Sequence, residues 1–217
     1  MRRMLILALG LLAVAPATVA AHEGNPNYES RVLSVSPAVD GVRVQVANYD
    51  DSLNLVNTSS KTVTVEGYEE EPYARVQGDG TVQVNQKSPA TYLNDDRYGK
   101  AEVPASADPK APPTWKTIDK TGRFTWHDHR IHWMSSAADP PQLKDKDKRT
   151  RIFGWTVPLT VDGQRATVSG DLFWKPSDDS GVPLALLLAI PLIIGAGVAL
   201  LVVARRRRDR RPAGEAW

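Results

Sequence analysis

Residues 152–174 read IFGWTVPLTVDGQRATVSGDLFW. Two runs rich in β-branched and aromatic residues flank Asp162-Gly163, and an Asp-Gly pair in this setting is a strong signal for a two-residue hairpin turn. Neither run repeats its apolar residues at helical spacing. The stretch therefore predicts a β-hairpin, and with it a mostly β fold.

The same period-two alternation recurs in the first half of the chain, where it predicts strands at 31–35, 42–46, 53–56, 62–66 and 81–84. About seven to nine short strands predict an antiparallel β-sandwich, either immunoglobulin-like or cupredoxin-like. Two stretches rich in Pro and Lys, 101–114 and 137–148, are predicted as surface loops. They enclose a short structured segment at 115–136.

The first 21 residues have the three parts of a secretory signal peptide. Two arginines precede an apolar core at 4–15, and Val19-Ala20-Ala21 supplies the small residues of a cleavage site. The core is too short to cross a bilayer, which takes about 20 apolar residues. Cleavage after Ala21 would make His22 the first residue of the mature protein, whereas cleavage after Ala20 would leave Ala21 in front of it.

The other end of the chain has the pattern of a membrane anchor. Residues 182–204 are uncharged and long enough to span a bilayer, and arginines dominate 205–211. The positive-inside rule places this cluster in the cytoplasm. We therefore expect an extracytoplasmic β-sandwich domain at 22–181 with a short stalk, one transmembrane helix at 182–204 and a basic cytoplasmic tail at 205–217. The protein would be a single-pass protein of the cell membrane with its domain outside.

Charge and cysteine content exclude several classes of function. The two ends hold eight of the 27 basic and two of the 25 acidic residues, which leaves residues 22–181 with a net charge of −4. Such a domain is not expected to bind nucleic acid, and the arginine cluster is explained by membrane topology. The chain has no cysteine, so disulfides, thiolate metal ligands and a cysteine nucleophile are all excluded.

The four histidines fall in two places: His22, and the segment WHDHRIHWM at 126–134. A mature chain beginning at His22 would offer its α-amine and its imidazole to one metal ion. On a strand, His127 and His129 would project from the same face and could share that ion. Four nitrogen donors are a set that Cu(II) favours, so copper, as Cu(II), is the expected cofactor.

Three neighbouring residues are further candidates. His132 has the opposite parity on a continuing strand and would reach the site only if a turn begins at Arg130. Asp128 could orient a histidine through a hydrogen bond. Met134 offers a soft thioether, either as an axial ligand or toward Cu(I).

An amino-terminal histidine paired with a distant His-x-His resembles the copper site of the B subunit of particulate methane and ammonia monooxygenases, which lies in an exported cupredoxin-like domain. The likeness to CopC-type copper carriers is looser, because their Asp-x-His pattern has no well-spaced counterpart at Asp128-His129. The stretches 67–73 and 88–93 resemble uncharacterised anchored proteins of actinobacteria. No catalytic partner subunit is visible, so the resemblance implies copper binding rather than monooxygenase activity.

Three functions remain open at this point. The first is copper delivery, uptake or buffering at the outer membrane face, with a copper-accepting protein or transporter as partner. The second is a mononuclear copper oxidase or monooxygenase-like enzyme, which would need an open coordination position beside a substrate surface. The third is an immunoglobulin-like interaction module without metal. The sequence favours the first.

Overall fold

The computed structural model describes residues 24–176 and 184–209, and the chain divides into two compact units, Met1–Pro176 and Ser177–Trp217. The described residues of the first unit form ten strands in two antiparallel sheets that pack as a sandwich around one apolar core. The larger sheet has the order β1 (Tyr28–Ser36), β10 (Gln164–Trp174), β9 (Thr150–Val161), β4 (Val63–Glu66), β5 (Pro72–Val76), β6 (Val82–Asn85) and β7 (Trp115–Asp119). The smaller sheet has the order β2 (Val42–Ala47), β3 (Ser52–Asn57) and β8 (Arg123–His127). A four-residue helix, α2 (Ala90–Leu93), follows β6.

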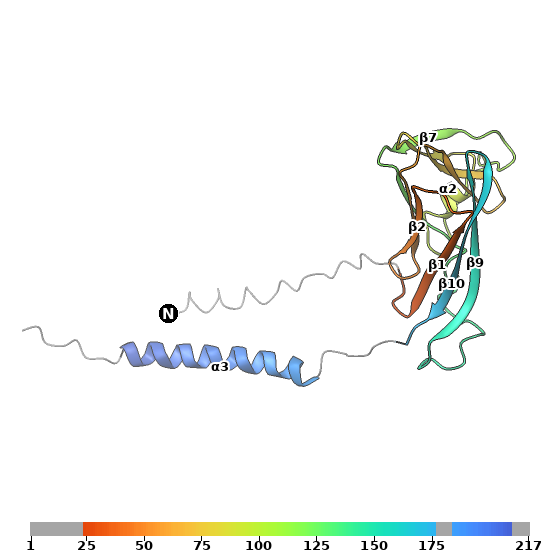
Figure 1. The fold of residues 1–217 in the computed structure, drawn as a ribbon. Helices are drawn as coiled ribbons and strands as arrows, with labels where there is room; N and C mark the ends of the chain where they lie inside the picture. Colours follow the sequence, from red (N-terminus) through yellow and green to blue (C-terminus); the bar gives the residue numbers. More distant parts are fainter. Residues whose placement is uncertain (1–23, 177–183, 210–217) are drawn as a thin grey trace, which may run out of the picture. The chain divides into compact units, whose positions relative to one another are not determined.

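The predicted hairpin is confirmed as β9 and β10, the longest strands of the sandwich. Asp162 and Gly163 both have positive φ, 48° and 78°, as a type I′ turn requires, and Val161 pairs with Gln164 across it. Figure 1 shows this hairpin running the length of the first unit with β1 beside it. The hairpin joins the two parts of the larger sheet, because β10 pairs with β1 and β9 pairs with β4.

Alternation along the strands places one face of each sheet in the core. Along β10, every second residue from Ala166 to Trp174 is buried. From the smaller sheet, Leu53, Leu55, Phe124 and Trp126 point into the same core. Burying a large apolar side chain is worth about 1.5–3 kcal/mol, so this shared layer is the main force holding the two sheets together.

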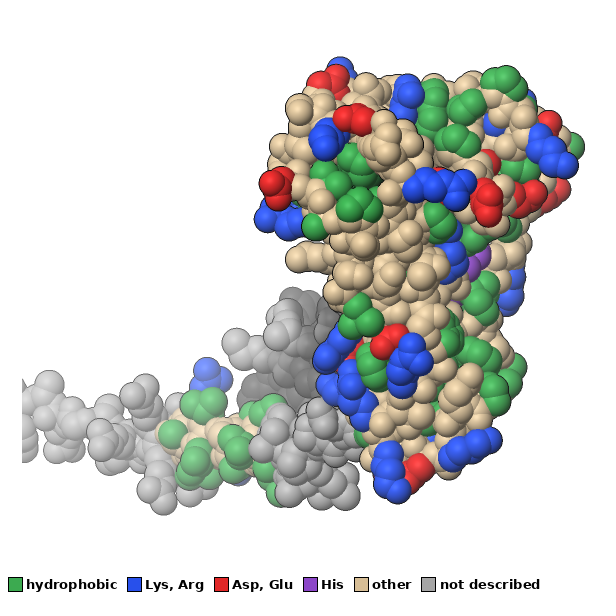
Figure 2. All heavy atoms as spheres, turned by 45° about the vertical axis from the view of Figure 1, so that its right-hand side comes forward, with side chains coloured by type: hydrophobic (Ala, Val, Ile, Leu, Met, Phe, Trp, Pro, Cys, Tyr) green, Lys and Arg blue, Asp and Glu red, His purple; other side chains and the backbone are tan. Residues whose placement is uncertain are grey.

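The sequence underestimated the number of strands. β5, β7 and β8 were not predicted as separate strands, although β7 and β8 fall within the structured segment expected at 115–136. The two predicted loops, 101–114 and 137–148, hold no helix or strand. Figure 2 shows basic side chains next to acidic ones over much of the visible face of this unit. Ion pairs such as Arg151–Asp171 and Lys146–Asp139 are part of this mixed surface.

The second unit has the helix α3 (Leu184–Asp209), which contains Pro191. Among the described residues, none of the helices combines the length and apolar character that crossing a membrane requires. The predicted signal peptide, His22, the first two residues of the predicted span and the tail end at 210–217 lie outside the described residues.

Candidate metal centre

The histidine segment begins as a strand and then turns. β8 ends at His127, and the Ile131 N–H donates to the Asp128 carbonyl oxygen at 3.1 Å. The expectation that one strand carries both His127 and His129 is therefore wrong. The turn spans Asp128–Ile131 and so begins two residues before Arg130, the position at which a turn was expected to return His132 toward the site.

The Asp128 carboxylate stabilises the turn. Its carboxylate is fully buried and accepts hydrogen bonds from the Trp126 indole N–H at 2.8 Å and from the Arg130 guanidinium at 2.7 and 2.8 Å. The guanidinium also donates to the carbonyl oxygens of Glu66, the last residue of β4, and of Gly67. Asp128 was considered as a residue that orients a histidine, but the hydrogen bonds of its carboxylate go to tryptophan and arginine, and it fixes the path of the segment.

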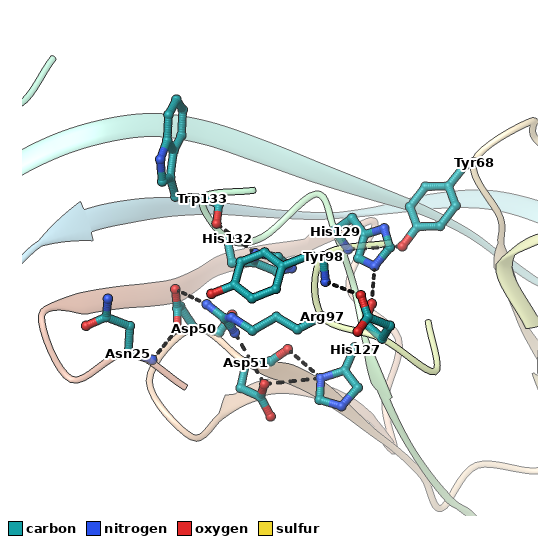
Figure 3. A network of polar contacts seen from close by, with 11 residues as sticks. Asn25, Asp50, Asp51, Tyr68, Arg97, Tyr98, His127, His129, His132 and Trp133 are labelled. Atoms are coloured by element: carbon teal, nitrogen blue, oxygen red, sulfur yellow. Dashed lines mark hydrogen bonds and ion pairs between the residues drawn. The ribbon is translucent and has the colours of Figure 1, made fainter. Parts of the chain in front are cut away.

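His127 contacts a buried ionic cluster. Its Nδ1 lies 3.2 Å from both the carbonyl oxygen and the carboxylate Oδ1 of Asp51. Arg97 lies behind Asp51, with guanidinium contacts of 3.2 Å to the Asp51 carboxylate and 2.7 Å to the Asp50 carboxylate. The other oxygen of Asp50 accepts the backbone N–H of Asn25 at 3.1 Å. The cluster thus ties the start of the described chain to the histidine segment (Figure 3).

His129 occupies a different position. Its ring stacks on Tyr68 with centroids 5.4 Å apart, and its Nε2 lies 2.9 Å from the Asp96 carbonyl oxygen. A carbonyl oxygen can only accept, so Nε2 bears a proton, and in the neutral ring Nδ1 is then the unprotonated nitrogen. In Figure 3, the His129 and His132 rings lie on one side of the Arg97 side chain and the His127 ring lies on the other.

His132 is almost completely buried. Its Nδ1 lies 3.2 Å from the Trp133 carbonyl oxygen, which by the same reasoning places the proton on Nδ1 and leaves Nε2 as an acceptor. Within the described part of the chain, this buried Nε2 has no hydrogen-bond partner. Burial, reinforced by the Arg97 cation, lowers the pKa of His132 to about 4, so the ring is neutral near pH 7. It meets the His129 ring edge to face, with centroids 5.8 Å apart.

Met134 lies on the same side as these two rings. His129, His132, Trp133, Met134, Ser135 and Phe153 line one cavity of about 320 Å³. His127 instead lines a second cavity, of about 720 Å³, together with Asp51 and Trp126. The structure therefore groups His129 with His132 and Met134, and places His127 with Asp51.

The structure does not bring the predicted pair together, because His127 and His129 line different cavities. Across residues 24–176 and 184–209, no three His, Cys, Asp or Glu side chains are placed to hold one ion. The expected participation of His22 lies outside the described residues. Three residues that shape the site were missed by sequence reasoning: Asp51, Arg97 and Gly99. They come from loops without a motif. The burial of two carboxylates beside an arginine distinguishes Asp51 and Arg97 in the structure, and positive φ beside the His129 ring distinguishes Gly99.

Comparison with known proteins adds no relative: no family model, no curated protein and no solved structure matches this chain. The class to which the chain is assigned must therefore rest on its own fold and site.

Proposed function

We propose that this chain is an exported, membrane-anchored copper-binding protein that delivers, takes up or buffers copper at the outer face of the membrane. The observation that supports it best is the pair formed by His129 and His132. Each ring donates one N–H to a fixed backbone oxygen, so that in its neutral form the other nitrogen can bind a metal. Metal-ligating histidines typically have this arrangement, because the second hydrogen bond fixes the tautomer and the ring orientation.

The buried Nε2 of His132 supports a ligand role on energetic grounds. A buried acceptor that finds no partner among the described residues costs about 1–3 kcal/mol in lost hydration. A metal ion on this nitrogen would remove that cost. Two imidazoles bound to one ion at about 2 Å have ring centroids roughly 4 to 6 Å apart. The separation of 5.8 Å between His129 and His132 agrees with such a pair.

The chemistry of the donors favours copper. Nitrogen donors bind Cu(II) more tightly than the other divalent first-row metals, and a nearby thioether favours Cu(I). The chain offers no thiolate, so cysteine-based zinc sites are excluded. Copper would be the cargo that is transferred to an accepting protein or transporter, and His129 and His132 would hold it.

The amine of a mature chain beginning at His22 remains part of the proposal, together with His127. Support comes from Asn25, whose backbone N–H is tied to Asp50 beside the Asp51–His127 pair. Asn25 follows His22 by three residues in the sequence. The carboxylate of Asp51 at His127 Nδ1 is also a common partner of a metal-binding histidine.

Membrane anchoring and the finer fold class are proposed on the sequence. The uncharged stretch 182–204 followed by arginines supports a single-pass anchor with the domain outside. Within the class of β-sandwiches, the exported copper site favours a cupredoxin-like or immunoglobulin-like domain.

The test is a copper titration of the full mature chain, purified in detergent with His22 as its first residue, by EPR and by competition with a chelator. We expect one-to-one Cu(II) binding with nitrogen hyperfine structure. One alanine added before His22 should weaken the Cu(II) affinity at least tenfold if the amine is a ligand. His129→Asn and His132→Asn should each lower the affinity for Cu(I) or for Cu(II). Affinities for Cu(II) and Cu(I) that no histidine substitution changes would refute the proposal.

A further inference from the structure

Met134 extends the histidine pair into a three-donor set. It is 40% exposed and lines the 320 Å³ cavity with His129 and His132. A Cβ built on Gly99 would lie 3.4 Å from the His129 Nδ1 and 3.8 Å from the Met134 methyl carbon. The nitrogen of His129 that is unprotonated therefore borders the same small space as the end of the thioether.

Gly99 keeps this space open. Its φ of +66° disfavours any side chain, and a Cβ there would also lie 3.0 Å from the His129 ring. The loop between Asp96 and Gly99 thus has two effects on the site. The Asp96 carbonyl oxygen orients the His129 ring, and the missing side chain of Gly99 leaves room beside Nδ1.

From this geometry, and resting on the copper-binding function proposed above, we infer that His129 Nδ1, His132 Nε2 and Met134 Sδ form a site for Cu(I). Thioether and imidazole together are a soft donor set of the kind that selects Cu(I), whereas Cu(II) prefers a planar set of nitrogen and oxygen donors. The site would be separate from His127, which lines the other cavity.

The charge of the ion supports the same oxidation state. All three donors are neutral, so they do not cancel the charge of a bound ion, and the His132 side of the site is buried. The cost of removing an ion from water grows with the square of its charge, which makes a divalent ion about four times more costly than a monovalent one. A neutral, partly buried donor set is therefore better suited to Cu(I).

The composition of the chain makes this inference easy to test. The chain has three methionines and no cysteine, and two of the methionines, Met1 and Met4, lie in the predicted signal peptide. In a chain beginning at His22, a sulfur atom bound to copper can only be that of Met134. X-ray absorption of the Cu(I)-loaded full mature chain should show a sulfur neighbour at about 2.3 Å.

The matched variants are Met134→Leu, which keeps an apolar side chain of similar size, and Ser135→Ala, which alters the same cavity without removing a donor. We expect Met134→Leu to abolish the sulfur signal and to lower the Cu(I) affinity at least tenfold, measured anaerobically against a chromogenic chelator. Its Cu(II) affinity should stay within twofold, and Ser135→Ala should keep the sulfur signal. Circular dichroism of both variants checks that they fold.

Two results would overturn the inference, and they differ in what else they imply. Cu(I) binding of equal affinity in wild type and Met134→Leu, without a sulfur neighbour, would refute the thioether site and leave the copper-binding proposal standing. Failure of wild type to bind either Cu(I) or Cu(II) would refute both.

Discussion

The buried His132 should make the stability of the copper-free protein depend on pH in a narrow window. Its folded-state pKa of about 4 lies well below the value near 6.5 that histidine has in an unfolded chain. Between these values the unfolded chain binds a proton at this position and the folded chain does not. Stability contributed by the neutral ring is therefore complete above about pH 6.5 and is lost as the pH falls toward 4.

The size of the effect follows from the two pKa values. Linkage predicts a loss of about 1.4 kcal/mol at pH 5.5 and about 2.5 kcal/mol at pH 4.5, relative to pH 7.5. Replacing His132 by Asn removes the titrating ring and keeps an N–H close to the position of Nδ1, which can still donate to the Trp133 carbonyl oxygen. The variant should be less stable than wild type at pH 7.5, because it leaves part of the ring volume unfilled. Its stability should fall less steeply in acid.

The assay is urea unfolding of copper-free wild type and His132→Asn at pH 7.5, 5.5 and 4.5, followed by tryptophan fluorescence. Five of the six tryptophans lie in the unit Met1–Pro176, so the signal reports on the sandwich. The difference in unfolding free energy between the two proteins should shrink by roughly 2–3 kcal/mol from pH 7.5 to pH 4.5. A difference that stays constant over this range would show that His132 is accessible to protons in the folded state, and would refute its burial as a neutral ring.

Two further predictions concern stability and use the same urea assay. Asp50→Ala should lower the unfolding free energy by about 3 kcal/mol, because it leaves the buried Arg97 with only part of its compensating charge. Arg151→Ala breaks an exposed ion pair and should lower it by less than about 1 kcal/mol. Equal losses would contradict the burial of the cluster. Gly170→Ala should cost more than about 2 kcal/mol, because its Cβ would lie 2.1 Å from an indole carbon and 2.3 Å from a backbone oxygen of β1. Gly163→Ala, whose Cβ would meet no atom within 4 Å, should cost only about 1 kcal/mol because of the positive φ at this position. A larger loss for Gly163→Ala than for Gly170→Ala would show that the strands around Gly170 move apart to accept a side chain.

Most of the strands that the sequence predicted differ in burial between their two faces, although β8, which also alternates, was not predicted as a separate strand. β10 alternates strictly between buried and partly exposed residues, and its hairpin partner is joined to it by an Asp-Gly turn. β7 was not predicted, because it is an edge strand in which every residue is at least partly exposed, so its sequence has no reason to alternate. β5 has two adjacent buried residues, Tyr73 and Ala74, which breaks the period of two. Alternation of apolar and polar residues indicates a strand that is buried on one face only. Exposed edge strands such as β7, and strands with adjacent buried residues such as β5, lack this pattern.

Charged residues were harder to interpret than apolar ones. The run Glu69-Glu70-Glu71 is typical of a solvated acidic turn, yet Glu71 is only 3% exposed and bonds to the Ser88 hydroxyl and the Glu69 N–H. Asp50 is fully buried because Arg97, 47 residues away in the chain, supplies a compensating charge. Whether a carboxylate faces water depends on a partner that only the fold brings near.

The candidate site was predictable to the extent that it depends on residue type, and not where it depends on loop backbone. The candidate ligands His129, His132 and Met134 could be named from the sequence, because their side chains are of types that bind metals. The oxygens that fix the tautomers of His129 and His132 are backbone carbonyls of Asp96 and Trp133, which any residue at those positions would supply. The spacing of the histidines therefore indicates a metal site only together with the path of the 96–99 loop. At Gly99 the site imposes a residue type, because a side chain there would enter the space beside His129 Nδ1.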